Sequence, residues 1–226
     1  MGHKVHPKIY RIPQIYVWDS KWYAKRKDMP VFLQEEVAIR DFLTKKLKDA
    51  GIDSISVERG PKEATVTILA AKPGVIIGRG GQGLEDLRKF IEKNILKFKI
   101  KVKINVQEVR QPALSAQVVA QSAAMDIEKR MPFRRVMKQI IERVTSAGAK
   151  GVKINMAGRL NGVEIARREM LSAGKMPLIT VRSDIDYAIA EAQTIYGKIG
   201  IKVWIYHGET FSRRDKFEKI EKSNKK

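Results

Sequence analysis

Apolar residues in the first half of the chain change between helical and strand spacing. Between Val31 and Ala50 they recur every three or four positions, which predicts an amphipathic helix closed by Gly51. Two runs rich in β-branched residues, at 52–57 and 65–69, predict strands joined by a tight turn. A glycine-rich loop follows, and apolar residues at helical spacing from 84 to 95 predict a second helix behind it.

The second half of the chain begins with two more helical patterns. Pro112 suits the first turn of a helix that continues to about residue 127, and the pair Met131-Pro132 ends it. The apolar stripe that starts at Phe133 predicts another helix, which ends near Gly148. The remaining strand-like segments lie at 152–156, 163–165, 179–185 and 201–206.

These elements predict an α+β protein with two domains. The N-terminal domain, residues 17–108, is expected to have a three-stranded sheet with helices on one face. The C-terminal domain, residues 109–211, is expected to place two helices on a mostly antiparallel sheet. Residues 1–16 are expected to form a basic arm, and residues 212–226 a basic tail.

The charge balance of the chain indicates its class of partner. The 226 residues include 45 lysines and arginines against 25 acidic residues, a net charge of +20, which favours a nucleic-acid partner. No apolar run approaches the ~20 residues that a membrane helix needs, and the N-terminus lacks the apolar core of a signal peptide, so we expect an intracellular protein without a membrane partner. Because there is no cysteine and there are only three histidines, we expect no disulfide, metal centre or cofactor.

Aromatic residues lie among the cations of residues 1–30. This mixture suits single-stranded RNA, whose bases stack on aromatic rings while cations such as Lys4 hold its phosphates. Alternatively, Trp18 and Trp22 anchor the segment to the protein core. We count Lys4 among the candidate RNA-binding residues.

The glycine-rich loop Gly78-Arg79-Gly80-Gly81 fits two unrelated phosphate-binding motifs. Extended to Gly83, it matches the G-x-G-x-x-G pattern of dinucleotide-binding folds. Only residues 75–77 form an apolar step before it, too few for the buried strand of such a fold. At 99–104, moreover, lysine alternates with isoleucine or valine, whereas a parallel strand between two helix layers is apolar on both faces.

The better interpretation is the G-x-x-G loop of a K-homology domain of type II, which clamps about four nucleotides by their backbone. Gly78, Arg79, Gly80 and Gly81 are then candidate RNA-binding residues. Such loops often carry two central basic residues, and here Gly80 occupies one of these positions.

Three cations gather on one face of the helix predicted from residue 133. At 100° per residue, Arg134, Arg135 and Lys138 fall within an arc of about 100°, opposite the apolar stripe. They form either an RNA-binding face or an ordinary solvated helix surface.

The segment 158–169 places cations around a glycine turn. Arg159, Arg167 and Arg168 are candidate RNA-binding residues. Glu164 and Glu169 are interpreted as ion-pair partners of these arginines and not as catalytic acids, because no nucleophile, base or metal cluster accompanies them.

Several ordered segments together resemble the bacterial-type family of small-subunit ribosomal protein number three. The resemblance rests on Met1-Gly-His-Lys-Val-His-Pro7 and on the segments 73–81, 132–138, 148–151, 158–167 and 197–204. It spans nearly the whole chain. It implies a place in the head of the small ribosomal subunit, bound to ribosomal RNA, with small-subunit proteins two, ten and fourteen as neighbours.

The resemblance also implies a role for the helix cations. Arg134, Arg135 and Lys138 match the family's basic residues at the channel through which messenger RNA enters, where they help to unwind structured messenger RNA. The protein is then not an enzyme, is not expected to form homo-oligomers, and belongs to the ribosome of the cytoplasm or of an organelle. The alternatives are a free K-homology RNA chaperone and a nucleic-acid repair enzyme.

Overall fold

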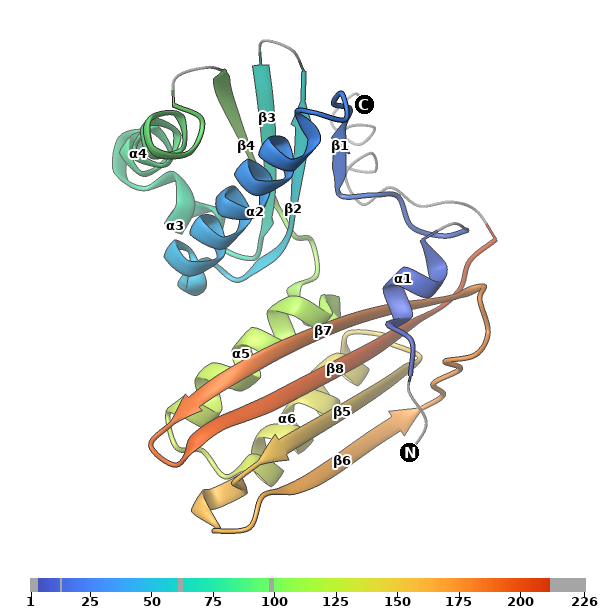
Figure 1. Ribbon diagram of the computed structural model, residues 1–226. Helices are drawn as coiled ribbons and strands as arrows, with labels where there is room; N and C mark the ends of the chain where they lie inside the picture. Colours follow the sequence, from blue (N-terminus) through green and yellow to red (C-terminus); the bar gives the residue numbers. More distant parts are fainter. Residues whose placement is uncertain (1–3, 13, 61–62, 98–99, 212–226) are drawn as a thin grey trace. The chain divides into compact units, whose positions relative to one another are not determined.

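The chain divides into two compact units in a computed structural model that describes residues 4–12, 14–60, 63–97 and 100–211 (Figure 1). One unit is Asp19–Arg110. The other combines Met1–Trp18 with Gln111–Lys226. The predicted tail 212–226 and Lys99 lie outside the described residues.

The first unit contains a K-homology arrangement of helices and strands. Its elements are β1 (Ser20–Trp22), α2 (Met29–Lys46), η1 (Lys48–Ala50), β2 (Ile52–Arg59), β3 (Glu63–Ala70), α3 (Pro73–Ile77), η2 (Arg79–Gly81), α4 (Gln82–Phe90), the π-helical turn η3 (Ile91–Ile95) and β4 (Lys101–Glu108). The strand order in the sheet is β1-β2-β3-β4, with β2 antiparallel to β3 and the two outer pairs parallel.

One face of this sheet carries the core. Alternate residues such as Val57, Val66 and Ile104 are buried and lie beside one another in register. They form one apolar cluster with Leu43 of α2 and Leu87 of α4, so the helices cover the same face of the sheet. The predicted class is therefore confirmed, including the lysine face of β4, where Lys101 and Lys103 are exposed and their neighbours Val102 and Ile104 are buried.

The sheet has one strand more than the three expected. β1 pairs with β2 over only three residues, which is too short for an alternating pattern to reveal it. Behind it, the hydroxyl of Ser20 and the indole N–H of Trp22 donate hydrogen bonds to the buried carboxylate of Glu36. Trp22 is thus anchored within its unit, whereas Trp18 is exposed.

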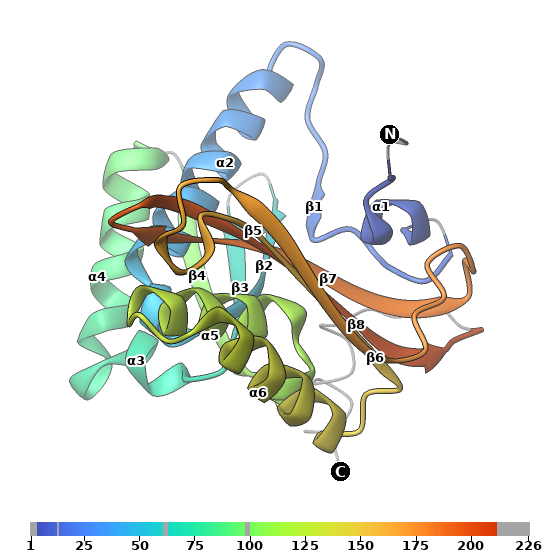
Figure 2. The same ribbon diagram turned by 90° about the horizontal axis from the view of Figure 1, so that it is seen from below.

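The second unit places helices on an antiparallel sheet, as predicted. Its elements are α1 (Pro7–Arg11), η4 (Pro112–Leu114), α5 (Ala116–Glu128), α6 (Phe133–Ser146), β5 (Gly151–Gly158), η5 (Leu160–Gly162), β6 (Arg167–Gly174), β7 (Ser183–Thr194) and β8 (Gly197–Glu209). The strand order is β6-β5-β8-β7 and every pairing is antiparallel. Helices α5 and α6 cover one face of this sheet, which we call the inner face (Figure 2).

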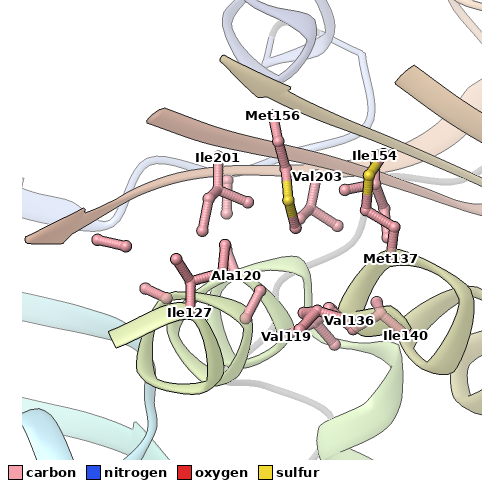
Figure 3. Close-up of a cluster of buried hydrophobic side chains, with 14 of the residues drawn as sticks. Val119, Ala120, Ile127, Val136, Met137, Ile140, Ile154, Met156, Ile201 and Val203 are labelled. Atoms are coloured by element: carbon pink, nitrogen blue, oxygen red, sulfur yellow. The ribbon is translucent and has the colours of Figure 1, made fainter. Parts of the chain in front are cut away.

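The core of this unit lies between the two helices and the inner face. Val119 and Ile127 of α5 and Val136 and Ile140 of α6 meet the alternate strand residues such as Met156 (Figure 3). Ser115 caps α5 by accepting a hydrogen bond from the Val118 N–H, in agreement with the preference for hydroxyl side chains at helix starts.

The positions predicted for two strands, 163–165 and 179–185, are wrong. Val163 and Ile165 are exposed in the loop before β6, and that strand begins only at Arg167. β6 is an edge strand with many polar residues, so its sequence lacks the β-branched run that marks a strand. The segment predicted at 179–185 is mostly loop, because the chain enters β7 at Ser183.

Residues 4–12 and 14–18 pack against the outer face of the sheet, opposite α5 and α6. The His6 ring lies edge-on to Tyr187 at 4.8 Å, and Tyr187 packs against Trp204 of β8. The Tyr16 hydroxyl donates to Asp184 at 2.8 Å, and burial together with this carboxylate raises the pKa of Tyr16. The N-terminal segment is therefore part of the second unit.

Candidate nucleic-acid interface

The glycine loop joins two helices with a backbone that favours glycine. Gly78, Gly80 and Gly81 have φ angles of +70°, +59° and +83°. A Cβ atom at Gly83 would lie 2.8 Å from the Ile76 carbonyl oxygen, so the start of α4 packs closely against α3. The loop geometry thus favours glycine at these positions.

The same loop leaves donors and a cation open to solvent. Gly78, Arg79 and Gly80 are exposed, and no side chain caps the N-terminus of α4. A helix N-terminus with free N–H groups favours an anion. A Cβ at Gly80 would meet no atom within 4 Å. A lysine or arginine at this position would, however, have to adopt the left-handed backbone conformation of Gly80.

The helix α6 separates packing residues from cations as predicted. Phe133 and Val136 are buried, whereas Arg134, Arg135 and Lys138 are exposed. None of the buried side chains of α6 is charged, so these cations do not hold the core together. The cations are presented on a helix whose position is set by packing.

The structure brings Arg167 to the same side of the sheet as Arg134. Their guanidinium carbons lie 5.6 and 5.7 Å from the Phe133 ring centroid. Both arginines also approach the Glu169 carboxylate, at 3.5 Å from Arg134 and 3.7 Å from Arg167. The predicted ion-pair role of Glu169 is confirmed, and because these groups are partly exposed the pairs are weak.

Arg168 points to the opposite face of the sheet. Its Nε donates to the Asn155 side-chain oxygen at 3.0 Å. Lys4, from the N-terminal segment, lies near Arg168. Burial lowers the pKa of Lys153, and the positive charges of Lys4 and Arg168 lower it further, so both cations are close to Lys153. Lys153 and Lys202 also lie on this outer face, and sequence reasoning missed both because each is a single lysine within an apolar strand.

Arg159 lies apart from these groups, near the turn between β7 and β8. Its Nε donates to the Val163 carbonyl at 2.9 Å, and its guanidinium lies 5.6 Å from the Tyr196 ring centroid. These contacts order the loop after β5. The structure therefore distributes the candidate residues over four places: the glycine loop, the inner side with α6, the outer face, and the Arg159 turn.

Within the described ranges, no three His, Asp or Glu residues come together in a way that could hold a metal ion. No helix in the described part of the chain combines the length and apolar character needed to cross a bilayer.

Comparison with known proteins gives matches to both units. A family model described as KH domain matches residues 38–114, and one described as ribosomal protein S3, C-terminal domain, matches residues 123–205. A small ribosomal subunit protein uS3 from Pelotomaculum thermopropionicum is 50% identical over 92% of this chain and 89% of its own length. Proteins of the same description from Xanthomonas campestris pv. campestris and Desulforudis audaxviator are 50% and 49% identical, over 93% and 95% of this chain and 85% and 97% of their own lengths.

Proposed function

Since the chain belongs to the ribosomal protein uS3 family and is a structural, non-enzymatic component of the small ribosomal subunit, we propose that it binds ribosomal RNA in the head of the subunit. We also propose that it borders the channel through which messenger RNA enters, and that it guides and helps to unwind the incoming strand. It acts in ribosomes of the cytoplasm.

The observation that carries the channel role is the cationic face of α6. Arg134, Arg135 and Lys138 are exposed on a helix that is fixed by its buried stripe. Cations on a fixed helix can bind the phosphates of a separated strand. Because the helix is already ordered, binding does not carry the entropy cost of ordering a loop. Nothing in the chain resembles a nucleoside-triphosphate loop, so the work of strand separation comes from translocation.

Replacement of Arg134, Arg135 and Lys138 by alanine tests this role. We expect the slope of log affinity against log salt for single-stranded RNA to fall by about 2, since each single-strand phosphate contact contributes ~0.7. Reconstituted ribosomes should cross a downstream messenger RNA hairpin several-fold more slowly while assembling normally, as followed by single-ribosome kinetics and sedimentation.

The matched control replaces three other exposed cations of the same unit, Lys129, Arg143 and Lys175. It removes the same charge from positions outside the Arg134–Lys138 cluster, with Arg143 in the last turn of α6, and should leave hairpin passage unchanged. Equal passage rates for the two triple variants would contradict a specific role for the α6 face.

The glycine loop gives a second test of RNA binding. The substitution Arg79→Glu should weaken binding of single-stranded RNA several-fold and lower its salt slope by about 0.7, because one phosphate contact is lost. Lys93→Glu, an exposed position near the far end of the same helical segment, makes the same charge change and should have a smaller effect. Filter binding at several salt concentrations compares them, and equal losses would exclude the loop from the binding site.

Neighbouring small-subunit proteins are also expected to contact the second unit. We propose proteins two, ten and fourteen as these neighbours.

A further inference from the structure

A cavity of about 900 Å³ opens on the outer face of the C-terminal sheet. The N-terminal segment around Lys4–Arg11 forms one wall, the loop 176–180 another, and strands β5 to β8 the floor. Its volume is within the range of small-molecule sites, ~300–1,000 Å³. All of these walls belong to one compact unit.

The charge in this cavity has a single sign. Lys4, Lys153, Arg168 and Lys202 line it, and none of the described lining residues is Asp or Glu. Within the described part of the chain, none of these four cations has a carboxylate within 4 Å. Burial and the neighbouring charges of Lys4 and Arg168 lower the pKa of Lys153, so the cations repel one another. A bound anion would relieve this repulsion.

The rest of the lining is aromatic and apolar. Trp204 and Tyr187 form part of the floor, and Val5, Tyr10 and Met176 contribute further apolar surface. The ammonium of Lys153 lies 5.5 Å from the Trp204 ring centroid, so a cation and the aromatic floor are adjacent. Such a combination suits a planar base attached to a phosphate better than a free inorganic anion.

Resting on the proposed RNA-binding function, we propose that this cavity binds one unpaired nucleotide of RNA. Its phosphate lies toward Lys153, Arg168 and Lys202, and its base lies against the apolar side. The base is held by contact with the apolar lining, while the cations supply the charge-assisted hydrogen bonds. The site is separate from the α6 cations, which lie on the other side of the sheet.

Methyl resonances of methionine in the full-length chain provide the test. Met176 lines the cavity, whereas Met156 is fully buried in the core and serves as an internal reference. Titration with adenosine monophosphate should shift the Met176 signal saturably, and more tightly than inorganic phosphate or adenosine does. The substitutions Lys153→Gln and Lys202→Gln together should weaken this binding about tenfold or more, as expected when charge-assisted bonds are removed.

Two further variants keep the test independent of folding and of net charge. Lys129→Ala with Arg143→Ala removes the same charge elsewhere and should leave the titration unchanged. Val5→Trp, at an exposed lining position, fills the cavity without removing a cation and should weaken nucleotide binding more than phosphate binding.

Several results would overturn the proposal. They are the absence of a saturable Met176 shift, equal affinity for phosphate and nucleotide, or unchanged binding in the double glutamine variant. A stronger shift with an acidic, leucine-containing peptide would assign the cavity to a protein segment instead.

The channel role is tested separately. The α6 triple variant should bind adenosine monophosphate normally, and the double glutamine variant should pass hairpins normally. Failure of the channel proposal would therefore appear in hairpin passage alone, and failure of the cavity proposal in nucleotide binding alone.

Discussion

Replacing Gly151 by alanine should destabilise the C-terminal unit by about 3 kcal/mol, near the upper end of the range for forced overpacking. A Cβ atom at Gly151 would clash with the carbonyl oxygen of Lys175, and one at Gly174, its partner on β6, would clash less severely with the carbonyl oxygen of Lys150. The obstruction is backbone, so no side-chain rotation can relieve it. The strands β5 and β6 would have to separate at this end and lose ladder hydrogen bonds. We expect a lower urea midpoint and reduced hydrogen-exchange protection of β5 and β6.

The control for this prediction is Gly200→Ala in β8. A Cβ there would approach only the Ala157 carbonyl, at 3.9 Å, and the backbone of Gly200 does not require a positive φ. We expect stability to be unchanged or increased by about 0.4–1 kcal/mol, because alanine restricts the unfolded chain. Hydrogen exchange in β2 and β3 of the other unit should be the same in both variants. Equal urea midpoints for Gly151→Ala and Gly200→Ala would contradict the packing argument.

Arg11→Met should release the N-terminal segment from the C-terminal unit. Arg11 is fully buried, and its guanidinium donates to the carbonyls of Pro7, Leu178 and Thr180 at 3.0, 2.8 and 2.9 Å. A hydrogen bond to a charged group contributes about 1.5–3 kcal/mol, and methionine would leave the carbonyls of Pro177, Leu178 and Thr180 without their Arg11 donor. We expect the local stability of residues 4–18 to fall by about 2–3 kcal/mol.

Hydrogen exchange of residues 4–18 and 176–182 measures this release directly. Tyr10→Phe is the matched control in the same helix, since it removes only an exposed hydrogen bond of 3.4 Å to the Ile179 carbonyl. Exchange in the control should rise little. If both variants exchange alike, then Arg11 is not the anchor of the segment.

Some of the candidate cations could be located from the spacing of nearby residues in the sequence, and others could not. Arg134, Arg135 and Lys138 follow from the helical period alone, because their angular positions oppose the apolar stripe that the core requires. The glycine loop follows from its spacing and from the elements around it. Arg11 looks like one more cation of a basic arm, but contacts with carbonyls more than 160 residues away bury it.

The outer-face cavity could not be predicted from any one segment. Lys153 and Lys202 are isolated lysines in apolar strands, and they meet because β5 pairs antiparallel with β8. Arg168 joins them through the pairing of β5 with β6, and Lys4 through the docking of the N-terminal segment. These approaches depend on strand order, on register and on the docking of a distant segment, none of which short-range periodicity encodes.

By itself, the sequence determined the α+β class, the glycine loop between two helices, and the cationic face of α6. All of these depend on residues a few positions apart, whose relative directions follow from helix and strand geometry. Only the tertiary structure decided that β1 adds a fourth strand, that Arg11 anchors the N-terminal segment, and that four distant cations share one cavity. These features join residues far apart in the chain, and their positions depend on which surfaces bury each other when the chain folds.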